Sequence, residues 1–229
     1  MKFLLIFFSC ILSTHASVDG FITKPPGEKL PKERFHALIK LMQKEFGYLA
    51  EKDGRKLQFF YDYKEDWAQA FARRWETDQV IVYGGASGLR GGTEDSFIMI
   101  LCHELGHLYG GKPFSDEYNR LSVEGQADYW STSYCWQKIM PKLVERTPSE
   151  LSLRECNYDE ACARGVDAGL VVTAFYADNR NIPHPGIDTP DPSVVQETLR
   201  VHPEPQCRLD TLLAGLIKEL RPSCWFASE

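Results

Sequence analysis

The feature that most constrains this chain is the segment His103-Glu104-Leu105-Gly106-His107, which lies within an apolar pattern of helical spacing. No charged side chain occupies positions 97–102 or 105–111, and Thr93 is a candidate N-cap. Residues four apart lie on one face of a helix, so both imidazoles can bind one Zn²⁺ while Glu104 reaches the water that the metal activates. The sequence therefore predicts a buried helix that carries a zinc site.

The third ligand distinguishes one type of zinc site from another. A third histidine in the pattern HExxHxxGxxH is excluded, because Pro113 holds the last position and cannot bind a metal. A second helix is expected from Ser122 to about Met140, and Glu124 and Asp128 lie one turn apart on it. Glu124 is therefore the expected third ligand. Asp128 is expected to orient a ligand histidine through the second ring nitrogen of that histidine.

Other polar and aromatic residues near the motif have simpler interpretations. The acids before and after the first helix are expected to be solvated: Glu94, Asp95, Asp116 and Glu117. Aromatic residues of buried helices are expected to belong to the core: Tyr83, Tyr109, Tyr129, Trp130 and Trp136. His36 and His184 are expected to be ordinary surface and turn residues.

A proline-rich stretch covers residues 178–206 and holds six of the 13 prolines. About two dozen residues follow it, too few to fold alone, so it is expected to be a long loop on one domain beside the active site. His202-Pro203 lies near the end of this stretch and Arg208 follows it.

These motifs resemble those of the gluzincins, and most closely those of the Ste24-type CAAX prenyl proteases and HtpX-like peptidases. The segment 103–107 matches the metal motif, the segment 124–128 looks like the ExxAD helix of that family, and His202-Pro203 with Arg208 is similar to its THP…R segment. The resemblance covers about residues 75–215. It implies a zincin-like fold, places His202 near the active site, and puts the strand Gln79–Tyr83 where gluzincins have the edge strand that binds peptide.

The first residues of the chain have the pattern of a signal peptide. Lys2 precedes an apolar run of ten residues, Phe3–Leu12, which is too short to span a membrane, and Thr14-His15-Ala16 provides a cleavage site. Residues 1–16 are therefore expected to be removed during export to the periplasm or beyond. A lipid anchor on Cys10 is the less favoured alternative, because the residues before Cys10 match lipoprotein processing poorly.

Charge and composition restrict the possible partners. The chain has 229 residues, with 26 Lys+Arg against 32 Asp+Glu and a net charge of −6. It therefore lacks the basic surface that nucleic acid or an anionic membrane would require. A peptide or protein substrate is expected, and no nucleic acid.

Six cysteines follow the expected signal peptide: Cys102, Cys135, Cys156, Cys162, Cys207 and Cys224. An even number in an exported chain indicates disulfides, although six cysteines allow 15 pairings. Cys156 and Cys162 are near enough in sequence to close a short loop, and Cys102 could instead be a buried free thiol. Because the spacings form no CxxC pair, a cysteine-ligated zinc site is not expected.

The remaining pattern predicts an α+β fold. An irregular arm is expected at 17–31, a helix from Lys32 to about Leu49, a β-prone segment at 57–63, a short helix at 67–75 and a strand at 79–83. The glycine-rich segment 84–92 is expected to be a loop, and 169–177 is either strand or helix. Residues 17–229 should form one zincin-like, disulfide-stapled domain, with a small mixed or antiparallel sheet packed on a helical zinc-binding half.

The expected function is that of an exported zinc endopeptidase. Zn²⁺ on His103, His107 and Glu124 would lower the pKa of its water to about 7. Glu104 would act as general base, and His202 would stabilise the oxyanion. The alternative is a non-catalytic exported module that holds zinc and binds a peptide or partner. Structural zinc sites fill all four positions with protein ligands, whereas three ligands leave one open, which favours the enzyme.

Overall fold

The computed structural model describes residues 27–115 and 117–228. The expected signal peptide, the alternative lipid anchor at Cys10 and residues 17–26 of the expected arm lie outside the described residues. The part of the arm that is described, 27–31, contains neither helix nor strand.

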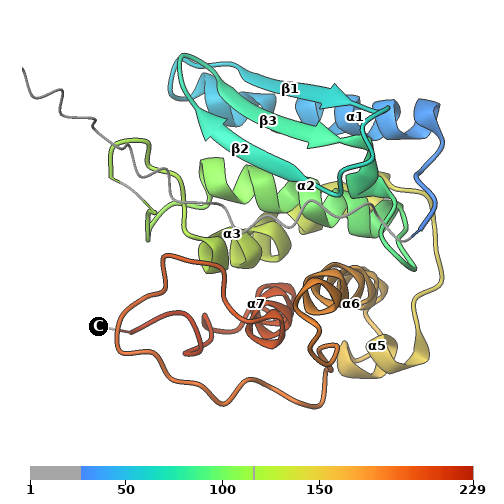
Figure 1. Cartoon of the computed structure of the whole chain (residues 1–229), viewed down its shortest axis with the longest axis vertical. Helices are drawn as coiled ribbons and strands as arrows, with labels where there is room; N and C mark the ends of the chain where they lie inside the picture. Colours follow the sequence, from blue (N-terminus) through green and yellow to red (C-terminus); the bar gives the residue numbers. More distant parts are fainter. Residues whose placement is uncertain (1–26, 116, 229) are drawn as a thin grey trace, which may run out of the picture.

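The class predicted from the sequence, α+β, is confirmed. The strands are β1 (Leu57–Asp62), β2 (Ala70–Arg74) and β3 (Asp78–Tyr83); the helices are α1 (Lys32–Glu51), α2 (Glu94–Tyr109), α3 (Glu124–Trp130), α4 (Gln137–Ile139), α5 (Glu150–Glu155), α6 (Glu160–Arg180) and α7 (Pro205–Ile217). The sheet forms one side of the molecule, α2 and α3 run beneath it, and α6 and α7 lie on the far side of α2 and α3 (Figure 1). No helix among the described residues is both long and apolar enough to cross a bilayer.

The sheet is small and mixed, as expected. Its strand order is β1-β3-β2, with β1 parallel and β2 antiparallel to β3. The expected helix at 67–75 is wrong, because 70–74 form β2, with Phe71 opposite Ile81 of β3. The segment 79–83 is also not the edge strand that the resemblance implied. It belongs to the central strand, where Val80 and Val82 are fully buried, and β1 and β2 form the two edges of the sheet.

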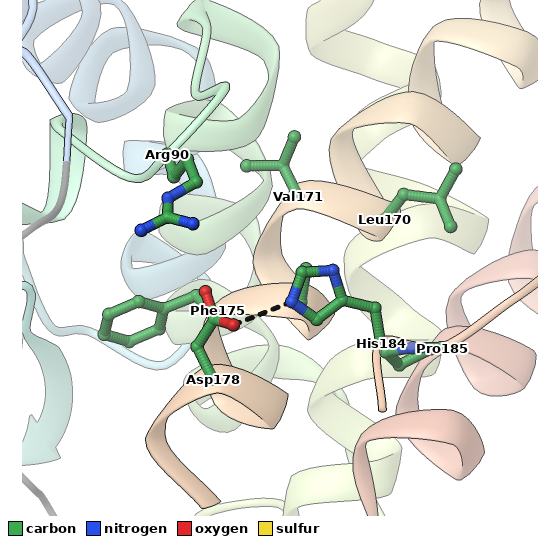
Figure 2. A pocket seen from close by; sticks show the side chains of 8 residues that line it. Arg90, Leu170, Val171, Phe175, Asp178, His184 and Pro185 are labelled. Atoms are coloured by element: carbon green, nitrogen blue, oxygen red, sulfur yellow. Dashed lines mark hydrogen bonds and ion pairs between the residues drawn. The ribbon is translucent and has the colours of Figure 1, made fainter. Parts of the chain in front are cut away.

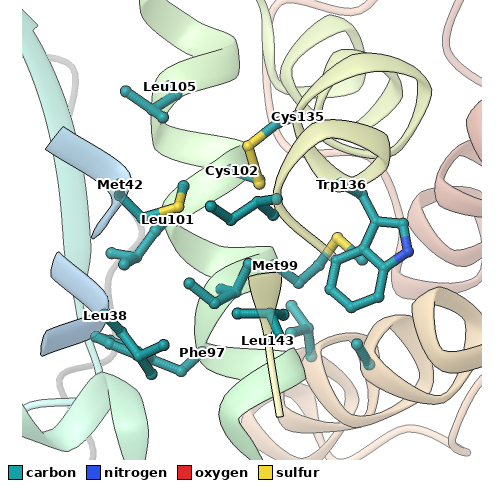
Figure 3. Packing of buried hydrophobic residues seen from close by; sticks show 14 of the residues in the cluster. Leu38, Met42, Phe97, Met99, Leu101, Cys102, Leu105, Cys135, Trp136 and Leu143 are labelled. Carbon is teal, nitrogen blue, oxygen red and sulfur yellow. A yellow bond between two sulfur atoms is a disulfide. The ribbon is translucent and has the colours of Figure 1, made fainter. Parts of the chain in front are cut away.

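Two long helices cover the buried face of the sheet. The expected helix from Lys32 is confirmed as α1, whose apolar face is buried, and Phe35 stacks on Phe97 of α2 with 5.0 Å between ring centroids. The expected cap of α2 is also present, because the Thr93 side chain accepts from the backbone N–H of Ser96 and the Ser96 side chain accepts from that of Thr93. Figure 3 shows how the apolar residues of α2 fill the space between the sheet side and the helices beneath it.

The second predicted helix, 122–140, is present with an irregularity. It begins as α3, widens into a π-helical stretch at Ser131–Trp136, and ends as α4. The wide turn carries Cys135, which forms a disulfide with Cys102 of α2. The alternative of a free thiol at Cys102 is therefore wrong.

Two further disulfides connect neighbouring elements. Cys156–Cys162, the short loop anticipated from the sequence, connects the end of α5 to α6, and Cys207–Cys224 connects α7 to the C-terminal segment. The ambiguous segment 169–177 is helical and lies inside α6. Of the expected proline-rich loop, residues 181–204 contain neither helix nor strand, which agrees with the expectation, whereas 178–180 belong to α6 and 205–206 to α7.

One expectation about the acids around α2 is wrong. Asp95 is not solvated but 3% exposed, and its carboxylate accepts hydrogen bonds of 2.9 and 2.6 Å from the Arg164 guanidinium of α6. Glu94 is half-buried beside Arg34, whereas Glu117 is exposed, as expected. A buried carboxylate requires such a partner, and Arg164, 69 residues later in the chain, provides it.

Candidate metal centre

The helices α2 and α3 approach closely at Gly106, the fourth residue of the motif. A Cβ atom at this position would lie 2.6 Å from the Ala127 carbonyl oxygen and 2.8 Å from its Cα atom, closer than real Cβ contacts. Only glycine therefore permits this helix contact. Because Glu124 lies one turn before Ala127, the contact brings Glu124 beside the two histidines.

Three side chains predicted from the sequence as ligands converge here. The Nε2 atoms of His103 and His107 are 3.1 Å apart. Glu124 places Oε2 at 3.2 Å from His103 Nε2 and Oε1 at 3.5 Å from His107 Nε2. Two atoms bound to one tetrahedral zinc at about 2.0–2.1 Å are separated by roughly 3.3–3.4 Å. The observed spacing of all three pairs brackets that value, so these residues fit a single Zn²⁺.

The other ring nitrogen of each histidine is held by the protein. His103 Nδ1 lies 2.7 Å from Asp128 Oδ1, and His107 Nδ1 lies 2.8 Å from the Ser122 backbone carbonyl oxygen. Both partners are acceptors, so each Nδ1 donates a proton and each Nε2 presents a lone pair toward the other. The structure thus brings Asp128 where it was expected. The contact of His107 with Ser122 was not predicted, because any residue at position 122 would offer the same backbone carbonyl group.

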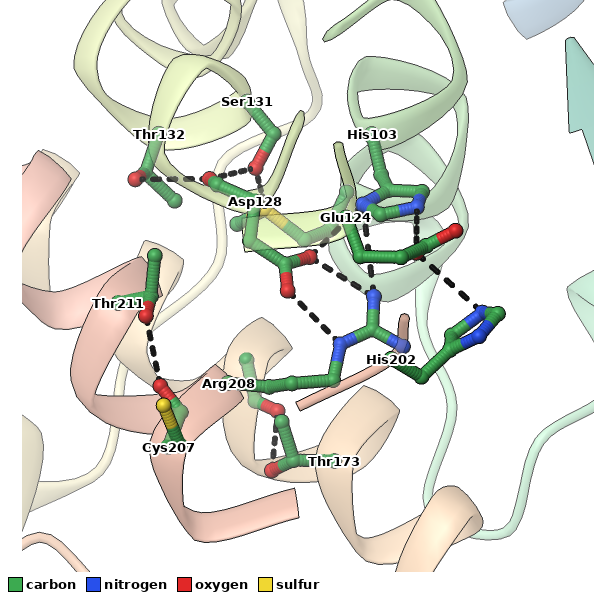
Figure 4. A network of polar contacts seen from close by, with 12 residues as sticks. His103, Glu124, Asp128, Ser131, Thr132, Thr173, His202, Cys207, Arg208 and Thr211 are labelled. Atoms are coloured by element: carbon green, nitrogen blue, oxygen red, sulfur yellow. Dashed lines mark hydrogen bonds and ion pairs between the residues drawn. The ribbon is translucent and has the colours of Figure 1, made fainter. Parts of the chain in front are cut away.

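Asp128 is in turn held by Arg208, which the sequence singled out only through the THP…R resemblance. Arg208 Nε and Nη2 donate to Asp128 Oδ2 and Oδ1, both at 2.8 Å, and both side chains are 2% exposed (Figure 4). Burial acts to raise the pKa of Asp128, but the charges of Arg208 and His103 lower it to about 2. The Arg208 guanidinium also lies 4.3 Å from the centroid of the Tyr176 ring on α6.

The centre carries a negative field that favours a cation. Burial opposes ionisation of Glu124, yet the charges of His107 and His103 hold its pKa well below its ordinary value. Burial also opposes protonation of His103, but Asp128 raises the pKa of His103 well above its ordinary value. A field that attracts a proton to a nitrogen attracts a metal cation to the same lone pair.

An unsatisfied oxygen marks the same point. Glu124 Oε2 is buried and has no hydrogen-bond partner, although His103 Nε2 and His202 Nε2 lie 3.2 and 3.3 Å away. Buried carboxylate oxygens are rarely left without a partner. A metal ion bound by His103, His107 and Glu124 would satisfy it.

Glu104 lies beside the three ligands and is free. Its residue is 6% exposed, and no described residue forms a hydrogen bond with its carboxylate. Burial raises the pKa of Glu104, although the neighbouring His103 and His107 act to lower it. A buried carboxylate with a raised pKa and no fixed partner can exchange a proton with a water molecule next to it.

His202 is the one predicted site residue that comes from the long loop. Its Nε2 lies 3.3 Å from Glu124 Oε2, and its side chain is 34% exposed. Burial lowers the pKa of His202. The structure therefore brings His202 to the metal centre. It leaves His36 and His184 elsewhere, since His36 packs on Tyr61 with 5.0 Å between ring centroids and His184 pairs with Asp178.

A second cluster of potential ligands does not resemble a metal site. Asp191 lies near Cys207 and Cys224, but these two sulfurs are bonded to each other and provide no thiolate. Comparison of the chain with protein-family models, with curated proteins and with solved structures finds no match. The chemistry of this centre is therefore inferred from its own residues.

The geometry predicts close to one zinc per chain. His107→Ala removes a ligand and should abolish stoichiometric zinc, whereas His184→Ala, which changes a histidine away from the centre, should retain it. Elemental analysis of the purified variants measures both. Undiminished zinc in the His107→Ala variant would contradict the site.

The contact at Gly106 predicts that a single methyl group weakens the site without touching a ligand. Gly106→Ala should raise the zinc dissociation constant by roughly 5- to 150-fold, because overpacking costs about 1–3 kcal/mol and here it acts on the helix contact that positions Glu124. Gly47→Ala in α1 is the matched control, since nothing lies within 4 Å of a Cβ atom there. Competition with a chromogenic chelator gives both constants. Equal constants for the two variants would show that the close approach does not position Glu124.

Proposed function

We propose that this chain is an exported zinc-dependent endopeptidase of gluzincin type, similar to the Ste24 and HtpX-like peptidases. One observation carries the proposal: three ligand atoms converge at zinc spacing beside a buried carboxylate, Glu104, that no described residue holds. The potential metal-binding group at this place has three members, His103, His107 and Glu124. Three protein ligands leave a position for water or substrate, which is the arrangement of catalytic zinc sites.

Each residue of the centre has a separate role in the proposed peptide hydrolysis. Zinc, when bound, lowers the pKa of a water molecule and polarises the scissile carbonyl group. Glu104 accepts a proton from the attacking water as the C–O bond forms, and later gives that proton to the leaving amine as the C–N bond breaks. Asp128 and Arg208 keep the His103 ring in the orientation that presents Nε2.

His202 is suited to the developing negative charge on the carbonyl oxygen. Its ring reaches the same carboxylate that binds the metal, from the side of the loop and not from the ligand helices. A neutral imidazole that donates one N–H can stabilise an oxyanion, and burial favours the neutral form of His202. Its partial exposure leaves it accessible to a substrate.

Strand β2 offers a place for an extended peptide. It is an edge strand, and it packs against α2, the helix that carries the two histidines. Arg74 at its end also donates to the Leu108 carbonyl oxygen near the end of α2, so strand and helix are held together. An edge strand binds a peptide by main-chain hydrogen bonds with little regard to sequence. The substrate is therefore proposed to be an extended segment of a peptide or protein.

Export is proposed from the covalent chemistry. Three disulfides within one chain are typical of proteins that leave the reducing compartments of the cell. Together with the signal-peptide pattern of residues 1–16, this favours a periplasmic or secreted enzyme.

The role of Glu104 predicts a specific separation of binding and catalysis. Glu104→Gln should retain zinc but lower kcat about 10²–10⁴-fold, because the amide cannot accept the proton of water. Glu150→Gln on α5, an exposed acid, is the control and should leave kcat unchanged. Digestion of a peptide library, with and without a chelator, measures the loss. A Glu104→Gln enzyme with more than about a hundredth of the original kcat would contradict the proposal.

His202 should act on the transition state and not on zinc binding. His202→Ala should lower kcat and kcat/KM together, by about 10²–10³-fold, while the zinc content stays the same. His184→Ala, in the same loop, should change neither constant. If His202→Ala raises only KM, its ring serves substrate binding and the oxyanion role is wrong.

A further inference from the structure

A pocket on α6 is not used by the metal centre. Its volume is about 280 Å³, and Figure 2 shows the side chains that line it: Arg90, Leu170, Val171, Ala174, Phe175, Asp178, His184 and Pro185. None of these residues is a proposed ligand, general base or oxyanion donor. Ligand pockets for drug-sized molecules are about 300–1,000 Å³, so this one suits one or two large side chains.

The pocket has an apolar floor and a rim that carries an arginine, Arg90. Leu170, Val171, Ala174 and Phe175 share one face of α6, and all four are partly exposed. On the rim, the Asp178 carboxylate already has a partner, because its Oδ1 lies 2.7 Å from His184 Nε2. Arg90 is exposed and pairs with no carboxylate among the described residues. An occupant with apolar side chains and a nearby acid would therefore complement this pocket.

The N-terminal arm enters the described structure directly beside this pocket. Gly27 donates its backbone N–H to the Gly88 carbonyl oxygen at 3.0 Å. A Cβ atom on Gly27 would lie only 2.7 Å from the Leu89 carbonyl oxygen. The first described residue is thus packed against the two residues that precede Arg90. The segment before Gly27 is therefore attached to the structure near the rim of the pocket.

The sequence of the arm has the composition that the pocket requires. Among residues 17–26, Ser-Val-Asp-Gly-Phe-Ile-Thr-Lys-Pro-Pro, the apolar pair Phe21-Ile22 follows Asp19 by two residues. Ile22 is five residues from Gly27, and five residues span up to about 17–18 Å when extended. Gly27 is bonded to Gly88, and Gly88 is two residues before Arg90 at the rim of the pocket. Phe21 and Ile22 are therefore within reach of the pocket.

We propose that the pocket beside Arg90 binds Phe21 and Ile22 of the chain's own N-terminal arm, with Asp19 facing the Arg90 guanidinium. Along α6, the pocket adjoins a residue that contacts the candidate metal centre. Phe175 of the pocket is followed by Tyr176, whose ring packs on Arg208 and lies 6.4 Å from the His202 ring, centroid to centroid. This intramolecular docking goes beyond the proposed peptidase activity and does not depend on it.

Photo-crosslinking tests the docking without any activity assay. Residues 17–229 carrying Phe21→p-benzoylphenylalanine are irradiated, digested and mapped by mass spectrometry. Cross-links are expected in the segments 170–178 and 184–185, within a monomer. The same photoreactive residue at Phe60, which is 46% exposed on the sheet, is the control and should give no cross-link to α6.

Two variants of the pocket complete the test. Ala174→Glu places a charge on the apolar floor and should lower the cross-link yield about tenfold or more. Arg90→Glu reverses the rim charge and should lower it about threefold, as expected for an exposed ion pair, while Arg154→Glu on α5 should leave it unchanged. Cross-links that map outside the pocket, cross-links only between two chains, or yields that both pocket variants leave unchanged would overturn the proposal.

Discussion

The buried ion pair between Asp128 and Arg208 is the interaction on which the arrangement of this molecule depends. It joins α3 to α7, and because Asp128 also accepts a hydrogen bond from His103, it fixes α2 to both. Separating the pair would leave a charge without a partner in the interior, which costs about 3–5 kcal/mol. The three helices therefore have one low-energy arrangement, and it is the one in which the ligand atoms meet.

Small residues at the helix contacts make this arrangement sterically possible. Beside Gly106 between α2 and α3, a side chain on Gly215 of α7 would collide with Thr132, and one on Gly125 of α3 would collide with the Trp225 ring. Trp225 is fully buried in a second, smaller core with Val123, at the point where α3 begins. The C-terminal segment thus positions the start of α3, and Glu124 is the first residue of that helix.

The sequence predicted the elements whose signals are local. The apolar pattern and Thr93 identified α2 with its cap, and the spacing of Glu124 and Asp128 identified the acids that the structure brings to His103 and His107. The predictions that failed concern long-range partners. Residues 70–74 become a strand because β3 supplies hydrogen-bond partners, and a short aromatic segment has no periodicity that distinguishes this outcome from a helix.

The same explanation applies to Asp95. The helix dipole stabilises an acid in the first turn of a helix. The position of Asp95 in the sequence is therefore explained without any partner side chain. Its actual partner, Arg164, is 69 residues away, and nothing in the local pattern indicates that α6 packs across the start of α2. The roles of Gly106 and Ser122 were missed for a related reason, since one acts by lacking a side chain and the other through its backbone.

The disulfide at Cys102 has a consequence for the rigidity of the candidate metal centre. Cys102 immediately precedes His103, and its bridge to Cys135 crosslinks the helix of the two histidines to the helical segment that continues from Glu124. The bridge therefore holds these two helical segments together independently of any bound metal. A chain kept among reducing thiols would hold these ligands on helices joined by packing alone. The covalent bond and the helix packing thus act on the same pair of elements, and reduction of this bridge would loosen the frame of the candidate site without changing any of its three side chains.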